Sequence, residues 1–190
     1  MNLRKIILIS AAAVIFLSAY LSWKSPVARS IRKGENVNIL LVGTDFVQNT
    51  LHSDTIVLMS YSPKNGFLDL VSIPRDTKIN FADDSSIKGI HRINEVFAYY
   101  YKKEKNYAAG LDAIRTLAAS LLHGRVEIPF YIQVNYASFI KFIDIIGGVS
   151  VDVEEAMKYD DTAQNLHIDF KPGLQRLNGK KALEYVRYRV

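Results

Sequence analysis

The sequence SIPRDT (residues 72–77), read together with SDT (residues 53–55), organises the fold that we predict for this chain. Two apolar runs of strand length, residues 56–61 and 67–73, lie between the two motifs and flank a Pro-Lys-Asn-Gly segment. Apolar strands joined by turn residues of this kind predict a β-hairpin. We expect a three-residue loop that ends at Gly66, with this glycine in the left-handed conformation.

That loop would set Asp54 directly opposite Asp76. Opposed side chains on paired strands have Cβ atoms about 4.5–5.5 Å apart, and two like charges at that distance need a positive group between them. The candidates for that group are a divalent cation and Arg75. Because a one-residue change in register would turn the two aspartates to opposite faces, the inference depends on the loop length. Two carboxylates beside arginine suit a phosphorylated ligand bound with Mg²⁺, although a solvated hairpin end fits the residues equally well.

Helical and extended patterns alternate along the rest of the chain. Helices are expected over residues 93–102, from an Asn106 cap to His123-Gly124, over residues 136–146, and from residue 177 onward. Short strands are expected over residues 37–42, 130–134, 149–153 and 166–170. Strands interleaved with helices, together with an antiparallel hairpin, predict an α/β fold with a mixed central sheet, which we assign as a three-layer α-β-α sandwich.

The N-terminus has the pattern of a transmembrane helix. Residues 6–23 contain no charged side chain and are just long enough to cross a bilayer, and Arg4 and Lys5 before them favour a cytoplasmic N-terminus. A cleaved signal peptide is the alternative, but the apolar run is longer than usual and no clear cleavage site follows it. We therefore expect a cytoplasmic tip and anchor over residues 1–24, a linker over 25–36 and one outward-facing domain over 37–190.

The net charge of +5 largely reflects this N-terminal segment. Residues 1–24 contain three basic and no acidic side chains, which leaves 21 basic against 19 acidic side chains in the remainder. Nucleic-acid binding normally needs a concentrated basic face, so we expect no nucleic-acid partner. The chain has no cysteine, which excludes disulfides and thiolate zinc sites.

The end of the chain, YVRYR (residues 185–189), places Arg187 and Arg189 two positions apart. On a helix these side chains would point about 200° apart, whereas in an extended segment they would share a face. If both arginines bind one anion, the last helix must end near Val186. A solvated basic helix end, stabilised by the helix dipole, is the alternative.

Taken in order, these motifs and several others resemble the LytR-CpsA-Psr (LCP) family. The set comprises LVGTD (41–45), SDTI (53–56), SIPRDT (72–77), RIN (92–94), DIIGGV (144–149), GLQ and LNG (173–175 and 177–179), and ALEYVRYR (182–189). The resemblance covers residues 38–189, and the order and spacing of the motifs make it specific.

The resemblance implies a membrane-anchored phosphotransferase of the bacterial cell envelope. Such an enzyme moves a glycopolymer, for example teichoic acid or capsule, from a polyprenyl-pyrophosphate carrier onto peptidoglycan. The implied site comprises Mg²⁺, with Mn²⁺ as the alternative, on Asp54 and Asp76; catalytic Arg75 and Asp76; and pyrophosphate-binding Arg75, Arg92, Arg187 and Arg189. The implied location is the bacterial cell membrane, crossed once, with the C-terminal domain outside the cytoplasm.

Three other functions compete with this one. A hydrolase would use the same site with water as the acceptor, and a binding module would hold the lipid pyrophosphate without turnover. A regulator of transcription is disfavoured, because an external domain without a DNA-binding motif could not reach DNA. Members of the family continue beyond the point where this sequence ends, so we expect the domain over residues 37–190 to be truncated at its C-terminus.

Overall fold

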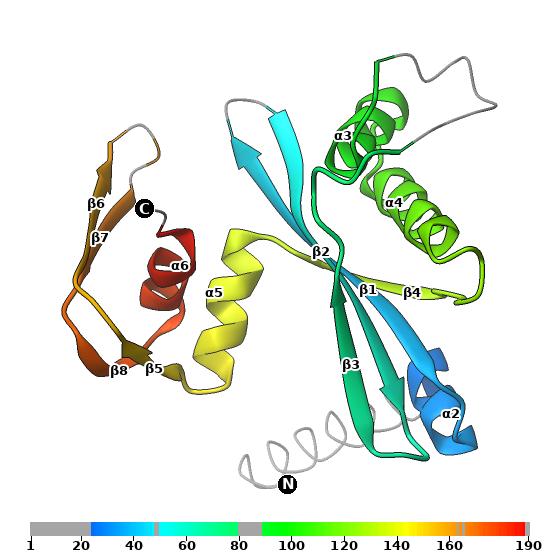
Figure 1. The fold of residues 1–190 in the computed structure, drawn as a ribbon, viewed down its shortest axis with the longest axis horizontal. Coiled ribbons are helices and arrows are strands. Elements are labelled where there is room, and N and C mark those ends of the chain that lie inside the picture. Colours follow the sequence, from blue (N-terminus) through cyan, green and yellow to red (C-terminus); the bar gives the residue numbers. More distant parts are fainter. Residues whose placement is uncertain (1–23, 48–49, 80–88, 163, 165, 189–190) are drawn as a thin grey trace, which may run out of the picture.

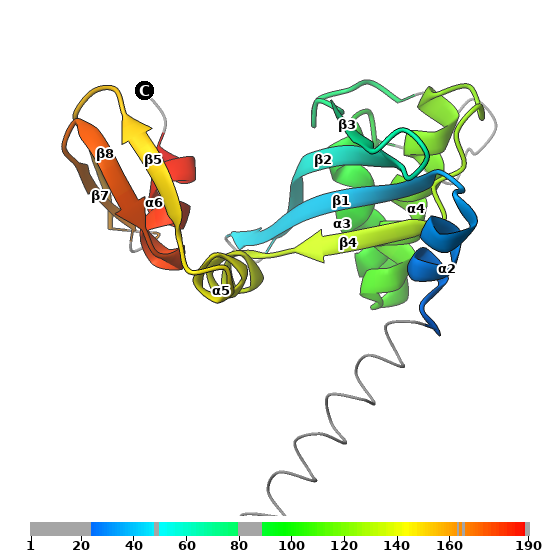
Figure 2. The ribbon, with the colours of Figure 1, turned by 90° about the horizontal axis from the view of Figure 1, so that it is seen from below.

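The chain forms two lobes joined by a single strand-to-helix connection (Figures 1 and 2). The structure is a computed structural model that describes residues 24–47, 50–79, 89–162, 164 and 166–188. The first lobe contains α2 (Pro26–Lys33), β1 (Val37–Val47), β2 (Thr50–Ser62), β3 (Phe67–Ser72), α3 (Ile93–Glu104), α4 (Tyr107–Leu121) and β4 (Phe130–Val134). The second contains α5 (Tyr136–Ile145), β5 (Val149–Val153), β6 (Met157–Asp161), β7 (Leu166–Phe170), β8 (Gly173–Leu177) and α6 (Gly179–Arg187).

A four-stranded mixed sheet in the order β3-β2-β1-β4 forms the centre of the first lobe. The β1–β2 and β2–β3 pairs are antiparallel, whereas β4 runs parallel to β1, so the predicted mixed sheet is confirmed. Helices α3 and α4 pack against the sheet, and their Phe97 and Ile114 join Leu40 and Ile56 in a core that excludes water. The described helices give this sheet one helical layer, and the second layer of the expected sandwich stays a prediction.

The second lobe packs α5 and α6 against two antiparallel strand pairs, β5–β8 and β6–β7. Its core contains Ile143, Ile168 and Phe170. Gly179 lets α5 and α6 meet, because a Cβ at this position would lie 2.1 Å from the carbonyl oxygen of Ile140. The same backbone contact is secured by Asp144, whose Oδ1 accepts a hydrogen bond of 2.7 Å from the Gly179 amide.

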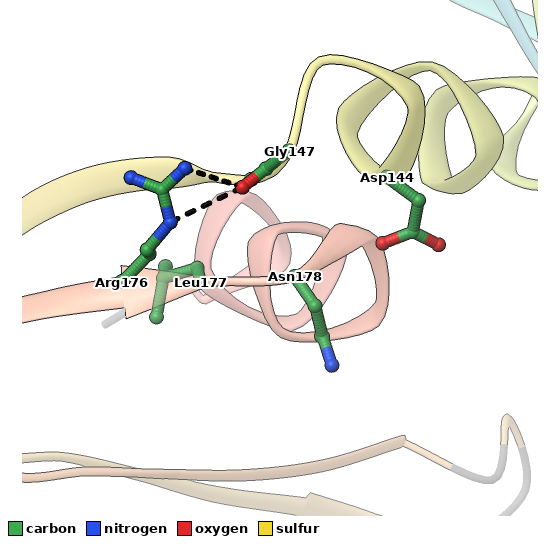
Figure 3. Close-up of a pocket in the computed structure, with 6 residues that line it drawn as sticks. Asp144, Gly147, Arg176, Leu177 and Asn178 are labelled. Atoms are coloured by element: carbon green, nitrogen blue, oxygen red, sulfur yellow. Dashed lines mark hydrogen bonds between the residues drawn. The ribbon is translucent and has the colours of Figure 1, made fainter.

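An open pocket lies where α5 turns into β5 (Figure 3). Arg176 on its rim donates from Nε and Nη2 to the carbonyl oxygen of Gly147, at 3.1 and 2.5 Å. Gly147 and Gly148 have positive φ and close the C-terminus of α5, as a cap and turn should. The polar groups here therefore hold the turn together, and the pocket is distinct from the site that the sequence predicts.

Local sequence signals predict most of these elements correctly. Strands β4, β5 and β7 have the expected bounds, α3 begins at Ile93, and Asn106 caps α4 by accepting from the Ala108 amide at 2.9 Å. Strands β6 and β8 are not predicted, and β1 and β2 are longer than expected. The predicted linker contains α2, which begins after a Ser25 cap and ends at left-handed Gly34.

The predicted transmembrane segment, residues 6–23, lies outside the described residues. Within the part of the chain that the structure describes, none of the helices is both long and apolar enough to span a bilayer.

Candidate active site

A β-bulge in the first sheet exposes Asp54. Gly43 pairs with Thr55 and Thr44 pairs with Ser53, so Asp54 has no partner residue on β1. Such a bulge breaks the strand alternation and re-aims a side chain. Ser53 is fully buried here, while Asp54 and its neighbour Thr55 are both exposed. The bulge therefore carries the Asp54 carboxylate to the open surface of the sheet.

The predicted hairpin forms, but its register differs by one residue. Ser62 pairs with Phe67 across a four-residue loop, in place of the predicted pairing of Pro63 with Phe67. Pro63 has no N–H to complete a hydrogen-bonded pair, and the loop instead closes through a 2.9 Å bond from the amide of Gly66 to the carbonyl of Ser62. Gly66 is left-handed as predicted, with φ of 67°. Because β3 also ends at Ser72, Asp54 and Asp76 are not a cross-strand pair, and that prediction is wrong.

A tight turn after β3 presents Arg75 and Asp76. The amide and hydroxyl of Thr77 both donate to the carbonyl of Pro74, at 2.9 and 2.6 Å, so Arg75 and Asp76 occupy the two corners of the turn. Arg75 lies between the aspartates: its Nη1 is 2.9 Å from Asp54 Oδ1 and its Nε is 3.6 Å from Asp76 Oδ2. The hydrogen bond to Asp54 is the main reason that the pKa of Arg75 is raised above its ordinary value. Of the two candidates for the positive group between the carboxylates, the structure contains the arginine.

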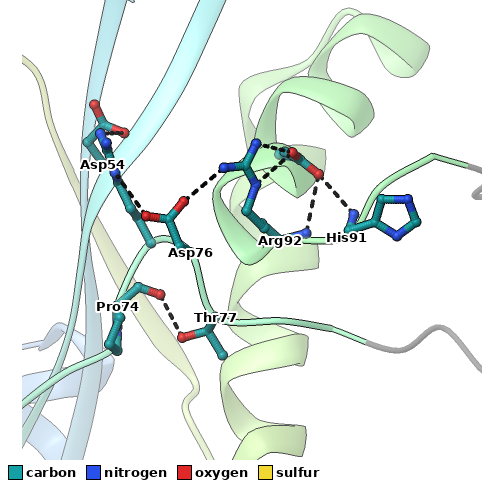
Figure 4. Close-up of polar contacts among 8 residues, drawn as sticks. Asp54, Pro74, Asp76, Thr77, His91 and Arg92 are labelled. Carbon is teal, nitrogen blue, oxygen red and sulfur yellow. Dashed lines mark hydrogen bonds and ion pairs between the residues drawn. The ribbon is translucent and has the colours of Figure 1, made fainter.

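Arg92 extends this arrangement at the N-terminus of α3 (Figure 4). Its Nη1 is 3.0 Å from Asp76 Oδ1, and its Nε and Nη2 lie 3.0 and 2.9 Å from Glu95 Oε1. These bonds, chiefly those to Glu95, raise the pKa of Arg92. Glu95 also accepts from the backbone amides of His91 and Arg92, and the His91 bond is the largest cause of its lowered pKa.

Backbone contacts hold the turn against α3. The amide of Ile93 donates to the carbonyl of Thr77 at 3.0 Å, and the amide of Asn94 donates to the carbonyl of Arg75 at 3.2 Å. The buried hydroxyl of Ser53 donates to the carbonyl of Asn94 at 3.1 Å, which ties β2 to the same helix end. The motifs SDT, PRDT and RIN thus form one connected unit, although they are far apart in sequence.

The unit forms a row in which negative and positive side chains alternate. Three carboxylates, Asp54, Asp76 and Glu95, are matched by two guanidinium groups, Arg75 and Arg92. The row is therefore net negative, and a pyrophosphate would add further negative charge. The chemistry of the row suits an anionic ligand only if a cation accompanies it.

Asp45 adds a carboxylate that the sequence prediction did not use. Its Oδ2 accepts a 3.0 Å hydrogen bond from the hydroxyl of Tyr136, and its Oδ1 is buried without a hydrogen-bond partner among the described residues. A buried carboxylate oxygen without a partner is costly and is suited to a hard cation. The signal for it was the polar Gly-Thr-Asp sequence that ends the first apolar run.

A divalent cation needs several oxygen ligands gathered around one position. No group of three or more histidine and carboxylate side chains within the described part of the chain is gathered to hold a metal ion. The oxygens of Asp54 and Asp76 have the hard character that Mg²⁺ prefers, and so does the unpartnered oxygen of Asp45. The three aspartates are therefore of the residue type that binds Mg²⁺, but the described structure does not gather all three around one position.

Arg187 reaches this region from the second lobe. Helix α6 ends at Arg187, one residue later than predicted, and Tyr188 after it is extended. The guanidinium carbon of Arg187 lies 4.8 Å from the ring centre of Tyr136, and Nη2 donates to Oε1 of Gln164. Arg189 lies outside the described residues, so its place on the same face as Arg187 stays a prediction.

Comparisons with known proteins identify relatives of this chain. The LytR_cpsA_psr family matches over residues 18–190. Bacillus cereus TagU, named a polyisoprenyl-teichoic acid–peptidoglycan teichoic acid transferase, is 32% identical over 160 residues, which are 84% of this chain and 46% of the relative. Bacillus subtilis TagU, of the same name, is 29% identical over 161 residues, again 84% of this chain and 46% of the relative. The chain thus spans about half the length of the curated relatives it matches.

Solved structures show the same fold. The crystal structure of B. subtilis TagV matches with a TM-score of 0.64 and 27% identity, over 82% of this chain and 57% of that chain. TagT, solved with bound octaprenyl pyrophosphate lipid, shares the fold with a TM-score of 0.58 and 24% identity, over 81% of this chain and 57% of that chain. The motifs, the fold and the relatives agree, and the chain belongs to the LytR-CpsA-Psr family.

Proposed function

We propose that this chain acts as a phosphotransferase that moves a glycopolymer from a polyprenyl-pyrophosphate carrier onto peptidoglycan. The observation that carries the proposal is the alternating row of Asp54 on β2, Arg75 and Asp76 on the following turn, and Arg92 at the start of α3. The TagU relatives support it, because their name specifies a polyisoprenyl-linked donor and a peptidoglycan acceptor. Teichoic acid is accordingly the first polymer to test, with capsule as the second.

In this proposal Arg75 and Arg92 bind the pyrophosphate. Both side chains are substantially exposed in their present ion pairs, and exposed pairs are weak. The guanidinium groups can therefore exchange carboxylate oxygens for phosphate oxygens, which they can grip bidentately. Arg187 would supply a further donor from the second lobe, and we propose the same role for Arg189.

Asp54 and Asp76 would hold Mg²⁺, or Mn²⁺ as the alternative, with Asp45 as an additional oxygen donor. The bound cation would neutralise charge on the phosphoryl oxygens. Arg75 now balances part of the charge of both aspartates. With a cation to balance that charge, its guanidinium group would be available to the pyrophosphate oxygens.

The reaction is a substitution at phosphorus. The oxygen of an acceptor hydroxyl bonds to the phosphorus attached to the sugar, the bond from that phosphorus to the bridging oxygen breaks, and polyprenyl phosphate leaves. The hydroxyl proton is released to a base or to solvent. Arg75 contributes chiefly by stabilising the negative charge that develops on the phosphoryl oxygens.

We also propose that the chain is anchored in the membrane and that a second helical layer covers the sheet of the first lobe. Residues 1–24 would anchor the chain in the bacterial cell membrane with a single pass, residues 25–36 would link the anchor to the domain, and residues 37–190 would face outward. A second helical layer would complete the three-layer sandwich over the sheet. The exposed apolar side chains of β3, including Leu68 and Leu70, support a cover or an apolar ligand there.

The experiment incubates the full chain with a synthetic polyprenyl-pyrophosphate glycan, peptidoglycan oligomers and Mg²⁺, followed by mass spectrometry. A peptidoglycan–phosphoglycan adduct is the expected product. Free phosphoglycan with no adduct would identify a hydrolase, and binding without either product would identify a binding module. If the chain neither converts nor binds the glycan donor, the proposal is refuted.

A further inference from the structure

Tyr136 lies where the two lobes meet. Strand β4 runs parallel to β1 with Gly43 opposite Val134, so the chain continuing past β4 brings Tyr136 beside Asp45. Asn135 caps α5 by accepting from the Ser138 amide at 2.9 Å, and the Ser138 hydroxyl accepts from the Asn135 amide at 2.8 Å. This reciprocal cap fixes the first turn of α5, and with it the direction of the Tyr136 side chain.

The two ends of this side chain contact different lobes. The hydroxyl donates to Asp45 Oδ2 on β1 at 3.0 Å, and the ring lies 4.8 Å from the guanidinium carbon of Arg187 on α6. Nη2 of Arg187 also donates to Oε1 of Gln164. The ring therefore acts as a platform for the arginine, while the hydroxyl ties that platform to the carboxylate side of the site.

We propose that Tyr136 is a positioning residue that holds Arg187 beside the carboxylates of the first lobe, so that arginines of both lobes grip one pyrophosphate. The inference rests on the proposed function, and it names a residue outside the arginine and aspartate motifs that define that site. It also explains how α6, which belongs to the second lobe, contributes to a site built on β2 and α3.

The hydroxyl holds the ring in place through its 3.0 Å hydrogen bond to Asp45 Oδ2. Ring and hydroxyl have separable tasks: the ring supports Arg187, and the hydroxyl fixes the ring.

A double-mutant cycle on the full chain tests this inference. The probe is farnesyl pyrophosphate, titrated calorimetrically in the presence of Mg²⁺, with farnesyl monophosphate as a comparison ligand. Arg187→Ala should weaken pyrophosphate binding about 10–100-fold, the range for a hydrogen bond to a charged group. Tyr136→Leu should weaken it about 2–5-fold, the range for a cation–π contact at a partly exposed site.

The decisive variant combines both changes. If Tyr136 acts through Arg187, adding Tyr136→Leu to Arg187→Ala should cause no further loss. Tyr136→Phe keeps the ring but loses the hydroxyl that fixes it, so its loss should be smaller than that of Tyr136→Leu. Tyr159→Leu is the matched control, because Tyr159 has a similar exposure of 43% against 37% for Tyr136 and lies on β6.

The outcomes separate the two proposals. Equal losses from Tyr136→Leu with and without Arg187 would overturn the positioning role alone, and so would an unchanged affinity in Tyr136→Leu. Failure of the unmodified chain to bind the pyrophosphate would overturn the proposed function together with this inference. If Tyr136→Leu strongly lowers the thermal unfolding midpoint, the affinities of Tyr136→Phe and Arg187→Ala for the pyrophosphate are compared instead. A loss of affinity in Tyr136→Phe as large as that in Arg187→Ala would contradict the role of the Tyr136 ring in supporting Arg187.

Discussion

Arg75→Ala should abolish transfer while leaving the fold almost unchanged. Arg75 makes two ion pairs, with Asp54 at 2.9 Å and with Asp76 at 3.6 Å, and the three side chains are 40%, 35% and 57% exposed. Exposed pairs contribute at most about 1 kcal/mol, and the longer pair contributes less. We therefore expect the free energy of unfolding to fall by less than about 2 kcal/mol for the two pairs together, measured by urea denaturation.

The effect on catalysis should be far larger. If Arg75 stabilises the charge on the phosphoryl oxygens, its loss should lower the transfer rate about 10²–10³-fold, as for removal of one donor from an oxyanion site. Arg75→Lys keeps the charge but loses the planar, two-pronged geometry of the guanidinium group, so its transfer rate should lie between that of the unmodified chain and that of Arg75→Ala. Transfer is measured by mass spectrometry of the peptidoglycan product under single-turnover conditions.

A matched control separates charge at the site from charge elsewhere. Arg115 on α4 pairs with Asp112 at 3.2 Å and is also partly exposed, but it lies outside the charged row. Arg115→Ala should lower stability without lowering the transfer rate of the remaining folded protein. Transfer by Arg75→Ala within tenfold of the unmodified rate would refute the role assigned to Arg75.

The remaining predictions concern the cation, acid stability, packing and topology. Asp76→Asn keeps the shape of the side chain but should abolish Mg²⁺-dependent transfer; normal activity with unchanged Mg²⁺ dependence would exclude Asp76 as a ligand. Because the folded-state pKa of Glu95 is lowered, chiefly by the His91 amide, its contribution to stability is present above the unfolded-state pKa of about 4.3 and is lost as the pH falls through the folded-state value. Urea unfolding between pH 6 and pH 3 should therefore show a steeper acid loss in the unmodified chain than in Glu95→Gln, and parallel curves would contradict this. Gly179→Ala should destabilise the second lobe by about 1–3 kcal/mol through overpacking, because its Cβ would meet backbone at 2.1 Å; an unchanged unfolding midpoint would show that α5 and α6 can separate without cost. A reporter that works only outside the cytoplasm should be active when it is fused to the C-terminus, since basic residues precede the apolar run. Activity of a reporter that works only in the cytoplasm would contradict the predicted topology.

The sequence by itself determined the features that depend on neighbours along the chain. Asn106 caps its helix through a bond to the amide two residues away, and Gly66 closes its loop by a bond to the carbonyl of Ser62. These interactions are complete within one turn of chain, so residue type and spacing are sufficient to predict them. The ordered motifs also identified the family, because each marks a local geometry that the fold requires.

Strands β6 and β8 could not be predicted in the same way. The residues of β6 are mostly polar and exposed, and β8 begins at a glycine. Neither has the alternating pattern of a half-buried strand, and each is a strand because of the partner it pairs with, β7 or β5.

Only the tertiary structure decided how the site is assembled. The predicted pairing of Asp54 with Asp76 required a hairpin register that differs by one residue from the observed register. In the structure, the bulge leaves Asp54 without a partner on β1, and Arg75 lies between the two carboxylates. Strand side chains alternate with a period of two, so an error of one residue in the loop length, four residues in place of three, reverses every orientation. The hydrogen bond from Tyr136 to Asp45 joins residues 91 positions apart. It forms because β4 pairs in parallel with β1, and that pairing depends on how the whole sheet packs.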